Sequence, residues 1–333
     1  MPEQDTRTPE NIALPNSEFI RKLENLWQRD HFVCVGLDSD YNNIPQTVKE
    51  SVSHFPSPVE ETIFRFNAKI VDATCDLVCA YKPNSAFYEA QGEQGMRALK
   101  RTVKYIKDQY PGIPVIYDAK RGDIGNTNDG YVRTLDEIGA DAITVHPYLG
   151  KEALKPFLAK KEKGVIVLVR TSNSGAGEIQ DIPIPVEMMY SQKEIEEYGK
   201  AEIDESQSDL FELVLRGSGD VDYLPLFQVL AWKIARHWNK NGNCGVVVGA
   251  TYPKELIDVR KLVGEMPILL PGIGAQGGDV EATVLAGMNS RKQGMIINSS
   301  RSIIFASKEE DFAQAARTAT EQLRTEINKY RGI

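Results

Sequence analysis

Short apolar runs recur along the chain, and each is nearly continuous in Val, Ile, Leu and similar residues. Continuous runs of this kind predict parallel β-strands that are covered on both faces. Most of the runs end in residues typical of turns. Eight of them occur, at residues 31–37, 77–81, 114–117, 142–146, 164–170, 245–249, 267–270 and 294–298.

Amphipathic segments with helical spacing separate these runs. They predict helices at residues 59–74, 93–108, 128–138, 152–161, 224–238, 253–263, 279–286 and 309–330, with one more helix at 17–28 before the first strand. Eight strand-then-helix units predict an α/β fold, a single-domain (β/α)8 TIM barrel over residues 17–333. An open doubly wound sheet can also hold many such units, and the count alone leaves that alternative open.

One spacing is irregular, between the fifth and sixth predicted strands. Residues 172–223 contain Pro183, Pro185, a charged stretch at 193–205 and a glycine pair, Gly217 and Gly219. We interpret this segment as an insertion in the fifth strand–helix loop, with a helix of its own. Loops at this position cover the active face of a barrel. The segment could therefore form a lid, form part of a dimer surface, or be a solvent-exposed loop without a role.

Composition narrows the class of function. The 333 residues include 39 basic and 47 acidic side chains, a net charge of −8, which argues against general nucleic-acid binding but allows a pocket for one phosphate. Residues 1–16 are polar and lack the apolar core of a signal peptide, so we expect a flexible tail. We expect no membrane span, because no run of about 18 apolar residues occurs. Three of the four cysteines lie in apolar, strand-like runs, which suits a cytoplasmic protein.

The residues that follow the strands are the candidates for chemistry, because a barrel carries its active site where strands pass into helices. Leaving charge beside a barrel core is costly unless the charge is paired or functional. Polar or ionisable residues stand at most of these positions: Asp38, Lys82, Asn84, Asp118, Lys120, Asp123, His146, Arg170, Thr171, Ser172, Ser300 and Arg301.

The third strand end carries the most informative cluster. Asp118 and Lys120 are two residues apart, so their side chains point to the same side of a strand. Gly122 allows a sharp turn that brings Asp123 back toward them or toward a partner subunit. With Lys82 from the neighbouring strand, the cluster predicts an alternating array of two lysines and two aspartates. A buried salt-bridge network without function is the alternative.

A glycine-rich segment follows the seventh strand. Gly272-x-Gly274-x-x-Gly277 fits the dinucleotide fingerprint, but that fingerprint belongs to an early strand–helix–strand unit with an acidic residue after the next strand. Here the segment comes late in the chain. The seventh and eighth loops of a barrel often bind phosphate through backbone N–H groups. Gln276 and Arg301 would add a neutral and a bidentate partner for that phosphate.

At this point the residues resemble the orotidine 5′-phosphate decarboxylase family. Asp118-x-Lys120-x-x-Asp123, followed by Ile124-Gly125-Asn126-Thr127, is similar to its signature, and Gly36-Leu37-Asp38, Lys82-Pro83-Asn84, Pro271-Gly272-Ile273 and Ser300-Arg301 match in the same order. The resemblance covers about residues 31–306 and is to the longer subgroup. It implies a homodimer that converts orotidine 5′-phosphate into UMP and CO2, the last step of de novo pyrimidine biosynthesis.

The resemblance also implies roles for the charged cluster. Lys120 would protonate C6 of the pyrimidine, and Asp118 would sit against the substrate carboxylate. Lys82 would hold the array together and touch the ribose. Asp123 and Thr127 would reach into the site of the other subunit and contact the ribose there.

Further substrate contacts follow from the same resemblance. Asp38 would bind a ribose hydroxyl, and either Thr171 or Ser172 would contact the pyrimidine. Gln276 and Arg301 would hold the phosphate. The remaining substrate-binding residues are expected to be Asn84, near the array, with Pro271 and Ser300.

These roles agree with the chemistry of the reaction. Loss of CO2 leaves a carbanion at C6 that cannot spread into the π system, and no cofactor signature offers an electron sink, so we expect no cofactor. We also expect no metal, because Lys82 stands where a metal-binding relative would carry a carboxylate. An ammonium group beside C6 stabilises the carbanion and can protonate it. Asp118 beside the carboxylate would raise the ground state, and phosphate binding would offset that cost.

Three rival functions stay open. A metal-dependent sugar-phosphate decarboxylase or isomerase shares the Asp-x-Lys-x-x-Asp spacing, but it would be expected to carry a carboxylate where this chain has Lys82. A Schiff-base aldolase could use Lys82 or Lys120 to form an imine. A non-catalytic nucleotide-binding barrel is disfavoured. Without selection for catalysis, mutation would be expected to replace at least one member of the Lys-Asp-Lys-Asp set.

Overall fold

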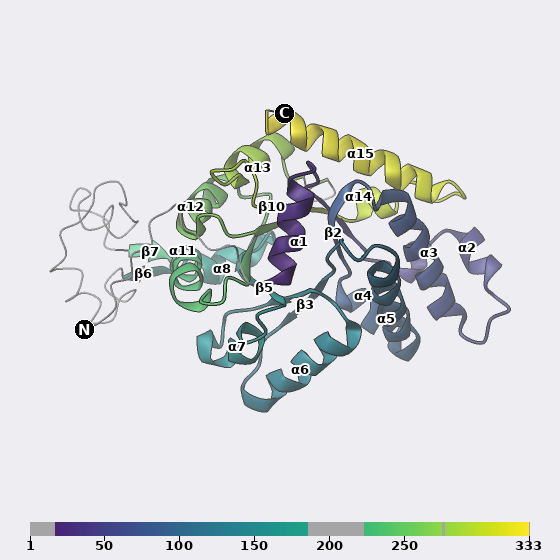
Figure 1. Cartoon of the computed structure of the whole chain (residues 1–333), viewed down its shortest axis with the longest axis horizontal. Helices are drawn as coiled ribbons and strands as arrows, with labels where there is room; N and C mark the ends of the chain where they lie inside the picture. Colours follow the sequence, from purple (N-terminus) through teal and green to yellow (C-terminus); the bar gives the residue numbers. More distant parts are fainter. Residues whose placement is uncertain (1–16, 186–222, 275–276, 333) are drawn as a thin grey trace.

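The computed structural model describes residues 17–185, 223–274 and 277–332. The expected tail at 1–16 and most of the insertion lie outside these ranges. The eight predicted runs form one parallel sheet in the order β2-β1-β10-β9-β8-β5-β4-β3 (Figure 1). Its strands are β1 (Val33–Gly36), β2 (Val78–Lys82), β3 (Ile116–Arg121), β4 (Ala142–Val145), β5 (Gly164–Arg170), β8 (Cys244–Val248), β9 (Ile268–Pro271) and β10 (Met295–Ser299).

The two terminal strands of that order, β2 and β3, also meet. The backbone N–H of Tyr81 donates to the carbonyl of Pro114 at 3.1 Å, and the N–H of Asp118 donates to the carbonyl of Pro83 at 3.0 Å. The sheet therefore closes on itself. The predicted (β/α)8 barrel is confirmed, and the open-sheet alternative is wrong.

The helices follow the predicted alternation. The main ones are α1 (Glu18–Trp27), α3 (Pro58–Thr74), α5 (Gly92–Gln109), α6 (Gly125–Ile138), α7 (Gly150–Leu158), α11 (Leu226–Lys233), α12 (Pro253–Val263), α13 (Val280–Gly287) and α15 (Phe312–Tyr330). Four short helices were not predicted, because four to six residues are too few to show a periodic pattern. They are α2 (Gln46–Ser51), α4 (Ser85–Glu89), α8 (Gly177–Gln180) and α14 (Arg301–Ile304).

The helix predicted at 224–238 is divided in the structure. Its first residues belong to β7 (Tyr223–Pro225), which pairs with β6 (Pro183–Pro185), so helix α11 begins at Leu226. Its last residues, Ile234–Trp238, form a π-helical turn. A hydrophobic pattern reports which residues are buried and cannot distinguish these hydrogen-bonding arrangements.

The strands are buried on both faces, which explains why they read as continuous apolar runs. Every residue of β2, β8 and β10 is buried, including the polar ends of β2 and β10. Inward side chains fill the barrel, and outward ones pack under the surrounding helices. The side chain of Lys82, at the end of β2, is therefore surrounded mostly by apolar residues.

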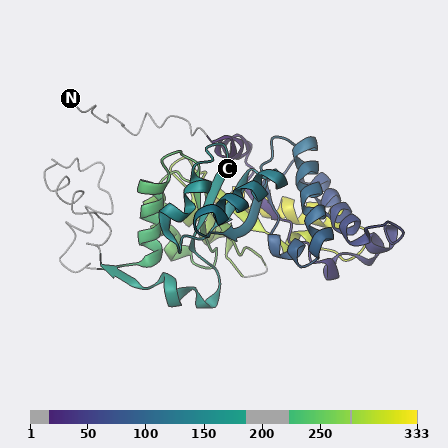
Figure 2. The same cartoon turned by 90° about the horizontal axis from the view of Figure 1, so that it is seen from below.

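Helix α1 lies across the amino-terminal end of the barrel (Figures 1 and 2). Its side chains Phe19 and Leu23 are fully buried. A Cβ on Gly164, the first residue of β5, would lie 2.2 Å from Cδ1 of Phe19, so the glycine allows the helix to approach this closely. The amino-terminal end is thus covered, and the opposite end of the strands is left for the site.

The fifth loop begins as predicted, after Arg170. Its described parts are a 3-10 turn (Ser174–Ala176), helix α8 and the antiparallel pair β6–β7, which projects beside α11 in Figures 1 and 2. The expected charged helix of the insertion lies outside the described residues. The division into residues 1–16, 17–333 and insertion 172–223 stays a prediction.

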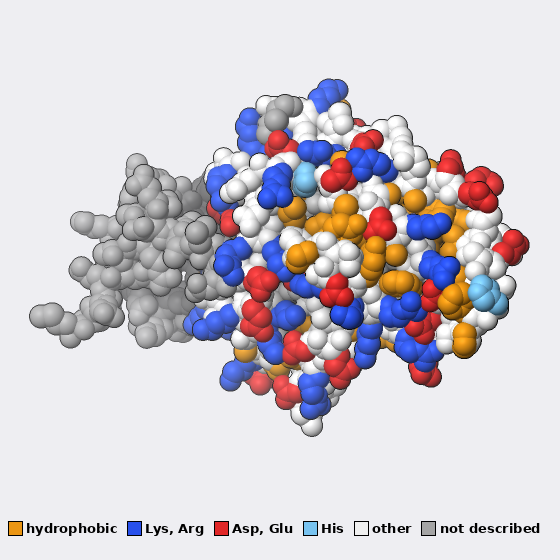
Figure 3. All heavy atoms as spheres, turned by 45° about the vertical axis from the view of Figure 1, so that its right-hand side comes forward, with side chains coloured by type: hydrophobic (Ala, Val, Ile, Leu, Met, Phe, Trp, Pro, Cys, Tyr) orange, Lys and Arg blue, Asp and Glu red, His pale blue; other side chains and the backbone are white. Residues whose placement is uncertain are grey.

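The surface charges are mixed in sign, and the three cysteines expected to be buried are buried. Figure 3 shows basic and acidic side chains interspersed over one face. Cys34, Cys79 and Cys244 are buried, as expected, and burial raises the pKa of Cys34 and Cys244 to about 12. Among the helices that the structure describes, none has both the length and the apolarity needed to cross a bilayer. The cytoplasmic location stays a prediction.

Candidate active site

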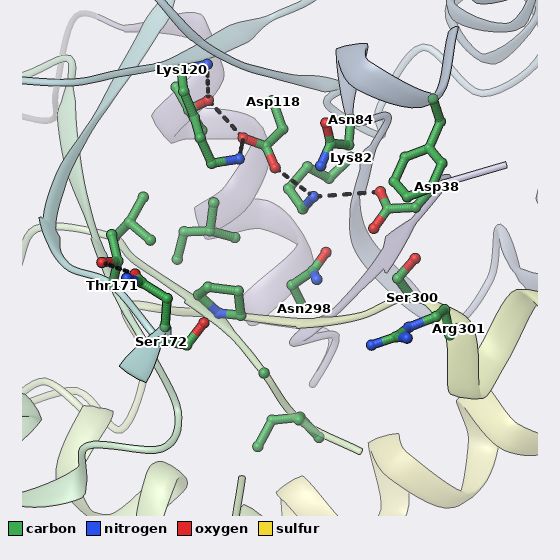
Figure 4. Close-up of a pocket in the computed structure, with 18 of the residues that line it drawn as sticks. Asp38, Lys82, Asn84, Asp118, Lys120, Thr171, Ser172, Asn298, Ser300 and Arg301 are labelled. Atoms are coloured by element: carbon green, nitrogen blue, oxygen red, sulfur yellow. Dashed lines mark hydrogen bonds and ion pairs between the residues drawn. The ribbon is translucent and has the colours of Figure 1, made fainter. Parts of the chain in front are cut away.

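A cavity of about 620 Å³ opens at the carboxyl ends of the barrel strands (Figure 4). This volume is in the range of pockets that bind small molecules. Ten predicted site residues line it: Asp38, Lys82, Asn84, Asp118, Lys120, Thr171, Ser172, Pro271, Ser300 and Arg301. Residues from the two ends of the sheet order and from its middle thus meet in one place, as barrel closure requires.

Two of the described site residues are not found at this cavity. Asp123 and Thr127 do not line it; Asp123 is half-buried and Thr127 is exposed at the start of α6. The Oδ1 of Asp123 accepts a hydrogen bond from the backbone N–H of Ile124 at 2.7 Å. Gln276 lies outside the described residues.

The charged side chains form a chain of contacts centred on Asp118 (Figure 4). Its Oδ1 lies 2.7 Å from Nζ of Lys120, and its Oδ2 lies 2.9 Å from Nζ of Lys82. Nζ of Lys82 lies 3.8 Å from Oδ1 of Asp38. Three members of the predicted array, Lys82, Asp118 and Lys120, are in contact within one subunit. The second aspartate in this contact is Asp38 and not Asp123, which does not line the cavity.

Burial and charge together set the ionisation of the array. The side chains of Lys82 and Asp118 are 3% and 9% exposed, whereas that of Lys120 is 49% exposed. Burial lowers the pKa of Lys82, but the charges of Asp118 and Asp38 outweigh that effect and raise it above its usual value. Burial raises the pKa of Asp118, but Lys82 and Lys120 outweigh it and hold the pKa well below its usual range. Lys82 and Asp118 are therefore both ionised at neutral pH.

The backbone at Lys120 explains how its side chain reaches Asp118. Lys120 has a φ of 47°, a left-handed conformation that a residue with a side chain rarely adopts. The pairing of β3 with β4 shifts register at this point. The ideal alternation that we used to predict the contact is therefore broken, although the two side chains do meet.

Thr144, at the end of β4, holds this irregular backbone in place, and the sequence did not single it out. Its hydroxyl accepts from the backbone N–H of Lys120 at 2.9 Å and donates to Oδ1 of Asp118 at 2.8 Å. It is 1% exposed and lines the cavity. One hydroxyl thus fixes both neighbours, and a threonine in an apolar run gave no signal of this.

The end of the cavity opposite the array is built by the loops after β9 and β10. Gly272 and Gly274 have φ values of 108° and 82°, so this turn needs glycine. Ser300 and Arg301 begin helix α14, and Oγ of Ser300 donates to the carbonyl of Gly36 at 3.0 Å. Because Arg301 is exposed, its guanidinium is available to a ligand. The glycine-rich segment belongs to the second-last barrel strand, which agrees with the barrel interpretation and not with a dinucleotide fold.

The residues after β5 differ in their hydrogen bonding. Oγ1 of Thr171 donates to Oδ1 of Asn173 at 2.6 Å and accepts from Nε2 of Gln180 at 2.8 Å. Ser172 also lines the cavity, and its hydroxyl makes no hydrogen bond to any residue in the described ranges. Of the two alternatives for a pyrimidine contact, Ser172 therefore has the freer hydroxyl.

Arg170 holds the beginning of the fifth loop against the barrel. It is 4% exposed, its Nη1 lies 3.0 Å from Oδ1 of Asp181, and its guanidinium lies 4.3 Å from the ring centre of Tyr252. Gln180 accepts from the backbone N–H of Thr171 at 2.9 Å. A buried arginine at a strand end therefore has a structural role here, which its position alone could not show.

The fold and this site define a (β/α)8-barrel enzyme whose charged residues converge at the carboxyl ends of the strands. A family model described as "Orotidine 5′-phosphate decarboxylase / HUMPS family" matches residues 32–215. The chain belongs to the orotidine 5′-phosphate decarboxylase family.

Relatives agree over nearly the whole chain. Orotidine 5′-phosphate decarboxylase of Cellvibrio japonicus is 43% identical over 93% of this chain and 98% of its own length. The same-named protein of Cupriavidus metallidurans is 44% identical over 94% of this chain and 98% of its own.

Solved structures share the fold. The structure of Leishmania donovani OMP decarboxylase has a TM-score of 0.71 and 30% identity, covering 95% of this chain and 99% of that one. Leishmania donovani UMP synthase has a TM-score of 0.72 and 32% identity, and the match spans 57% of that longer chain.

Proposed function

We propose that this protein decarboxylates orotidine 5′-phosphate to UMP and CO2, the last step of UMP biosynthesis. The observation that carries the proposal is the Lys82–Asp118–Lys120 contact at the floor of the cavity. The relatives that match over nearly the full chain are named for this reaction. The description of the family model names a second group, HUMPS, beside the decarboxylase. A metal-dependent sugar-phosphate enzyme would be expected to carry a carboxylate at the second strand end, so the ammonium of Lys82 there favours the decarboxylase.

Lys120 is the proposed proton donor. The bond between C6 and the carboxylate breaks, its electron pair stays on C6, and CO2 leaves. The ammonium of Lys120 stabilises the developing carbanion and transfers a proton to C6, and the neutral amine then regains a proton from solvent. Its 49% exposed side chain provides the contact with solvent that this last step needs.

Asp118 has two proposed roles. It lies between two ammonium groups, and its charge raises the pKa of Lys82 and keeps that lysine ionised despite its burial. It would also face the substrate carboxylate and raise the energy of the bound substrate, which is relieved as CO2 departs. Phosphate binding, remote from the breaking bond, would offset the cost of that repulsion.

Thr144 gives the first prediction about this array. Thr144→Val should lower kcat by about 10- to 100-fold, because a hydrogen bond to a charged group is worth about 1.5–3 kcal/mol. Without the hydroxyl, the carboxylate of Asp118 and the left-handed backbone of Lys120 each lose a hydrogen bond that fixes their position. Steady-state turnover measures the effect, and Thr144→Ser, which keeps the hydroxyl, should stay within about threefold of the wild type. An unchanged kcat in the valine variant would show that the hydroxyl does not position the array.

The phosphate is assigned to the other end of the cavity. Arg301 would make a bidentate contact, and the loop after β9, including Gln276, would donate further hydrogen bonds. Asp38 and Lys82 would bind the ribose, with Asn84 near the array. Pro271 would contact the substrate from the end of β9. We assign the pyrimidine contact to Ser172, whose hydroxyl is the freer of the two.

Gly36 provides a test of the phosphate assignment. A Cβ there would lie 2.7 Å from Cβ of Ser300 and would displace the start of α14, which carries Arg301. Gly36→Ala should weaken UMP binding by about tenfold, roughly the loss of one hydrogen bond to a charged group, because Arg301 would no longer face the phosphate. Isothermal titration measures this, with Gly112→Ala as the control because a Cβ at Gly112 meets open space. Equal affinity in both variants would speak against a phosphate site beside Ser300.

The proposed mechanism uses no metal, no imine and no organic cofactor. The position where a metal-binding relative would carry a carboxylate holds Lys82, ion-paired to Asp118. The test is the loss of orotidine 5′-phosphate ultraviolet absorbance with and without EDTA, and again after borohydride. Turnover that resists both supports the proposal. Loss with EDTA would point to a metal, and borohydride inactivation in the presence of substrate would point to an imine.

We propose that the active form is a homodimer in which Asp123 and Thr127 contact the ribose in the partner's site. Neither residue lines the cavity of its own subunit. Three large apolar side chains near this region are exposed: Ile124 at 63%, Tyr148 at 84% and Leu149 at 43%. Exposed large apolar side chains can mark protein interfaces, which supports a partner subunit here.

A mixing experiment tests the shared site. Lys120→Ala and Asp123→Ala should each be nearly inactive as homodimers. After joint refolding in equal amounts, about a quarter of wild-type activity should return, because half the dimers are mixed and each has one intact site of two. Activity that stays at the level of the separate variants would show that Asp123 serves its own subunit or no site.

A further inference from the structure

Asn298 is a buried polar residue of the cavity that the proposed function leaves unused. It lies near the end of β10, is 6% exposed and lines the cavity. Its Oδ1 is buried and has no hydrogen-bond partner among the residues that the structure describes. Figure 4 shows its carboxamide in the space between Lys82 and Arg301.

The position of Asn298 separates two kinds of cavity wall. Strands β5, β8 and β9 contribute the apolar side chains Leu168, Val247 and Leu269. The strands on the other side contribute the charged array. Asn298 pairs in register with Cys34 of β1, which places its strand beside the polar wall. An apolar side chain of similar size would have continued the apolar wall.

The neighbouring strand leaves room for this carboxamide. Gly36 has no side chain, and a Cβ there would lie 3.2 Å from Oδ1 of Asn298. An amide oxygen that is buried without a partner costs about 1–3 kcal/mol. Unpaired buried polar groups of this kind are expected mainly where a ligand supplies the partner.

The part of the substrate that spans the array and the phosphate is the ribose. A ribose hydroxyl both donates and accepts, so it can satisfy the carboxamide whichever of its atoms faces the cavity. We propose that Asn298 positions the substrate by hydrogen bonding to one ribose hydroxyl and so helps to select nucleotides that carry that hydroxyl. This inference rests on the substrate orientation given under the proposed function.

The experiment measures the affinity of three nucleotides, UMP, 2′-deoxy-UMP and 3′-deoxy-UMP, for the wild type and Asn298→Leu. The leucine variant should bind UMP about tenfold more weakly, the loss expected for one hydrogen bond. For the nucleotide that lacks the contacted hydroxyl, the same substitution should change the affinity by less than about twofold. It should not lower the melting temperature, because it removes an unpaired polar atom from the interior.

Asn289→Leu is the matched control. Asn289 is also a buried asparagine, with Nδ2 unpartnered among the described residues, but it does not line the cavity. Its Oδ1 accepts from the backbone N–H groups of Arg291 and Gln293, so this variant should lose stability. This variant should bind all three nucleotides as the wild type does. Equal weakening of all three by Asn298→Leu, or no weakening of UMP, would overturn the assignment of Asn298 alone. A wild-type protein that neither binds UMP nor consumes orotidine 5′-phosphate would overturn the proposed function itself.

Discussion

Replacing Lys120 with alanine should lower kcat for orotidine 5′-phosphate by at least about 10⁴-fold. The substitution removes both the proton donor and the positive charge beside the carbanion, and each effect alone is typically worth about 10²- to 10³-fold or more. The affinity for UMP should change by less than about tenfold, because Lys120 acts at the reacting carbon and the phosphate lies elsewhere. Stopped-flow absorbance gives kcat, and titration gives the affinity.

Lys107→Ala is the matched control. Lys107 pairs with Asp141, which also lies 2.9 Å from Nζ of Lys22, so the three form a Lys–Asp–Lys contact like the one in the cavity. Asp141 directly precedes β4, at the amino-terminal end of the barrel. The control should keep wild-type kcat. A Lys120→Ala variant that retains more than about a hundredth of wild-type turnover would mean that another group protonates C6.

Replacing Asp118 with asparagine should lower kcat by about 10³-fold or more without raising KM. If Asp118 repels the substrate carboxylate, removing its charge relieves the bound substrate as well as disabling the array, so KM should stay the same or fall. The substitution also removes one of the two carboxylates that pair with the buried ammonium of Lys82. Among the described residues, only Asp38, at 3.8 Å, would then form an ion pair with this ammonium, whose side chain is 3% exposed. Breaking a buried pair in this way costs about 3–5 kcal/mol of stability.

Asp141→Asn separates the two effects of that substitution. It also removes a buried aspartate charge held between two lysines, so it should destabilise the fold by a similar amount. It should leave kcat and KM unchanged, because it does not face the cavity. If Asp118→Asn raises KM strongly while kcat is kept, the repulsion that we assign to Asp118 is wrong.

The barrel could be predicted from the sequence because its strands are buried on both faces. Such strands read as continuous apolar runs, and all eight form the sheet. Site residues at strand ends could be predicted for the same reason, since closure brings those ends together. The short helices, the β6–β7 pair and the π-helical turn depend on hydrogen bonding that hydrophobic patterns do not report.

The contacts within the site could be predicted only in part. The sequence indicates Asp118 with Lys120, but the left-handed backbone that joins them depends on Thr144, which is distant in the chain. Asn298 could be found only from its burial and missing partner. The Lys22–Asp141–Lys107 contact shows that a salt-bridge network of the alternative, structural kind also exists in this barrel. Only the position relative to the cavity distinguishes the two networks.

The central claim is that Lys120 exchanges a proton with C6 of the pyrimidine, and hydrogen exchange in the product tests it most directly. By microscopic reversibility, the lysine that protonates C6 also removes that proton. UMP is incubated with the protein in D2O and followed by proton NMR. We expect the C6 signal to disappear while the C5 signal stays, and the rate to fall by at least about 10³-fold in Lys120→Ala. Exchange at C6 that is no faster with the wild type than with this variant would contradict the account.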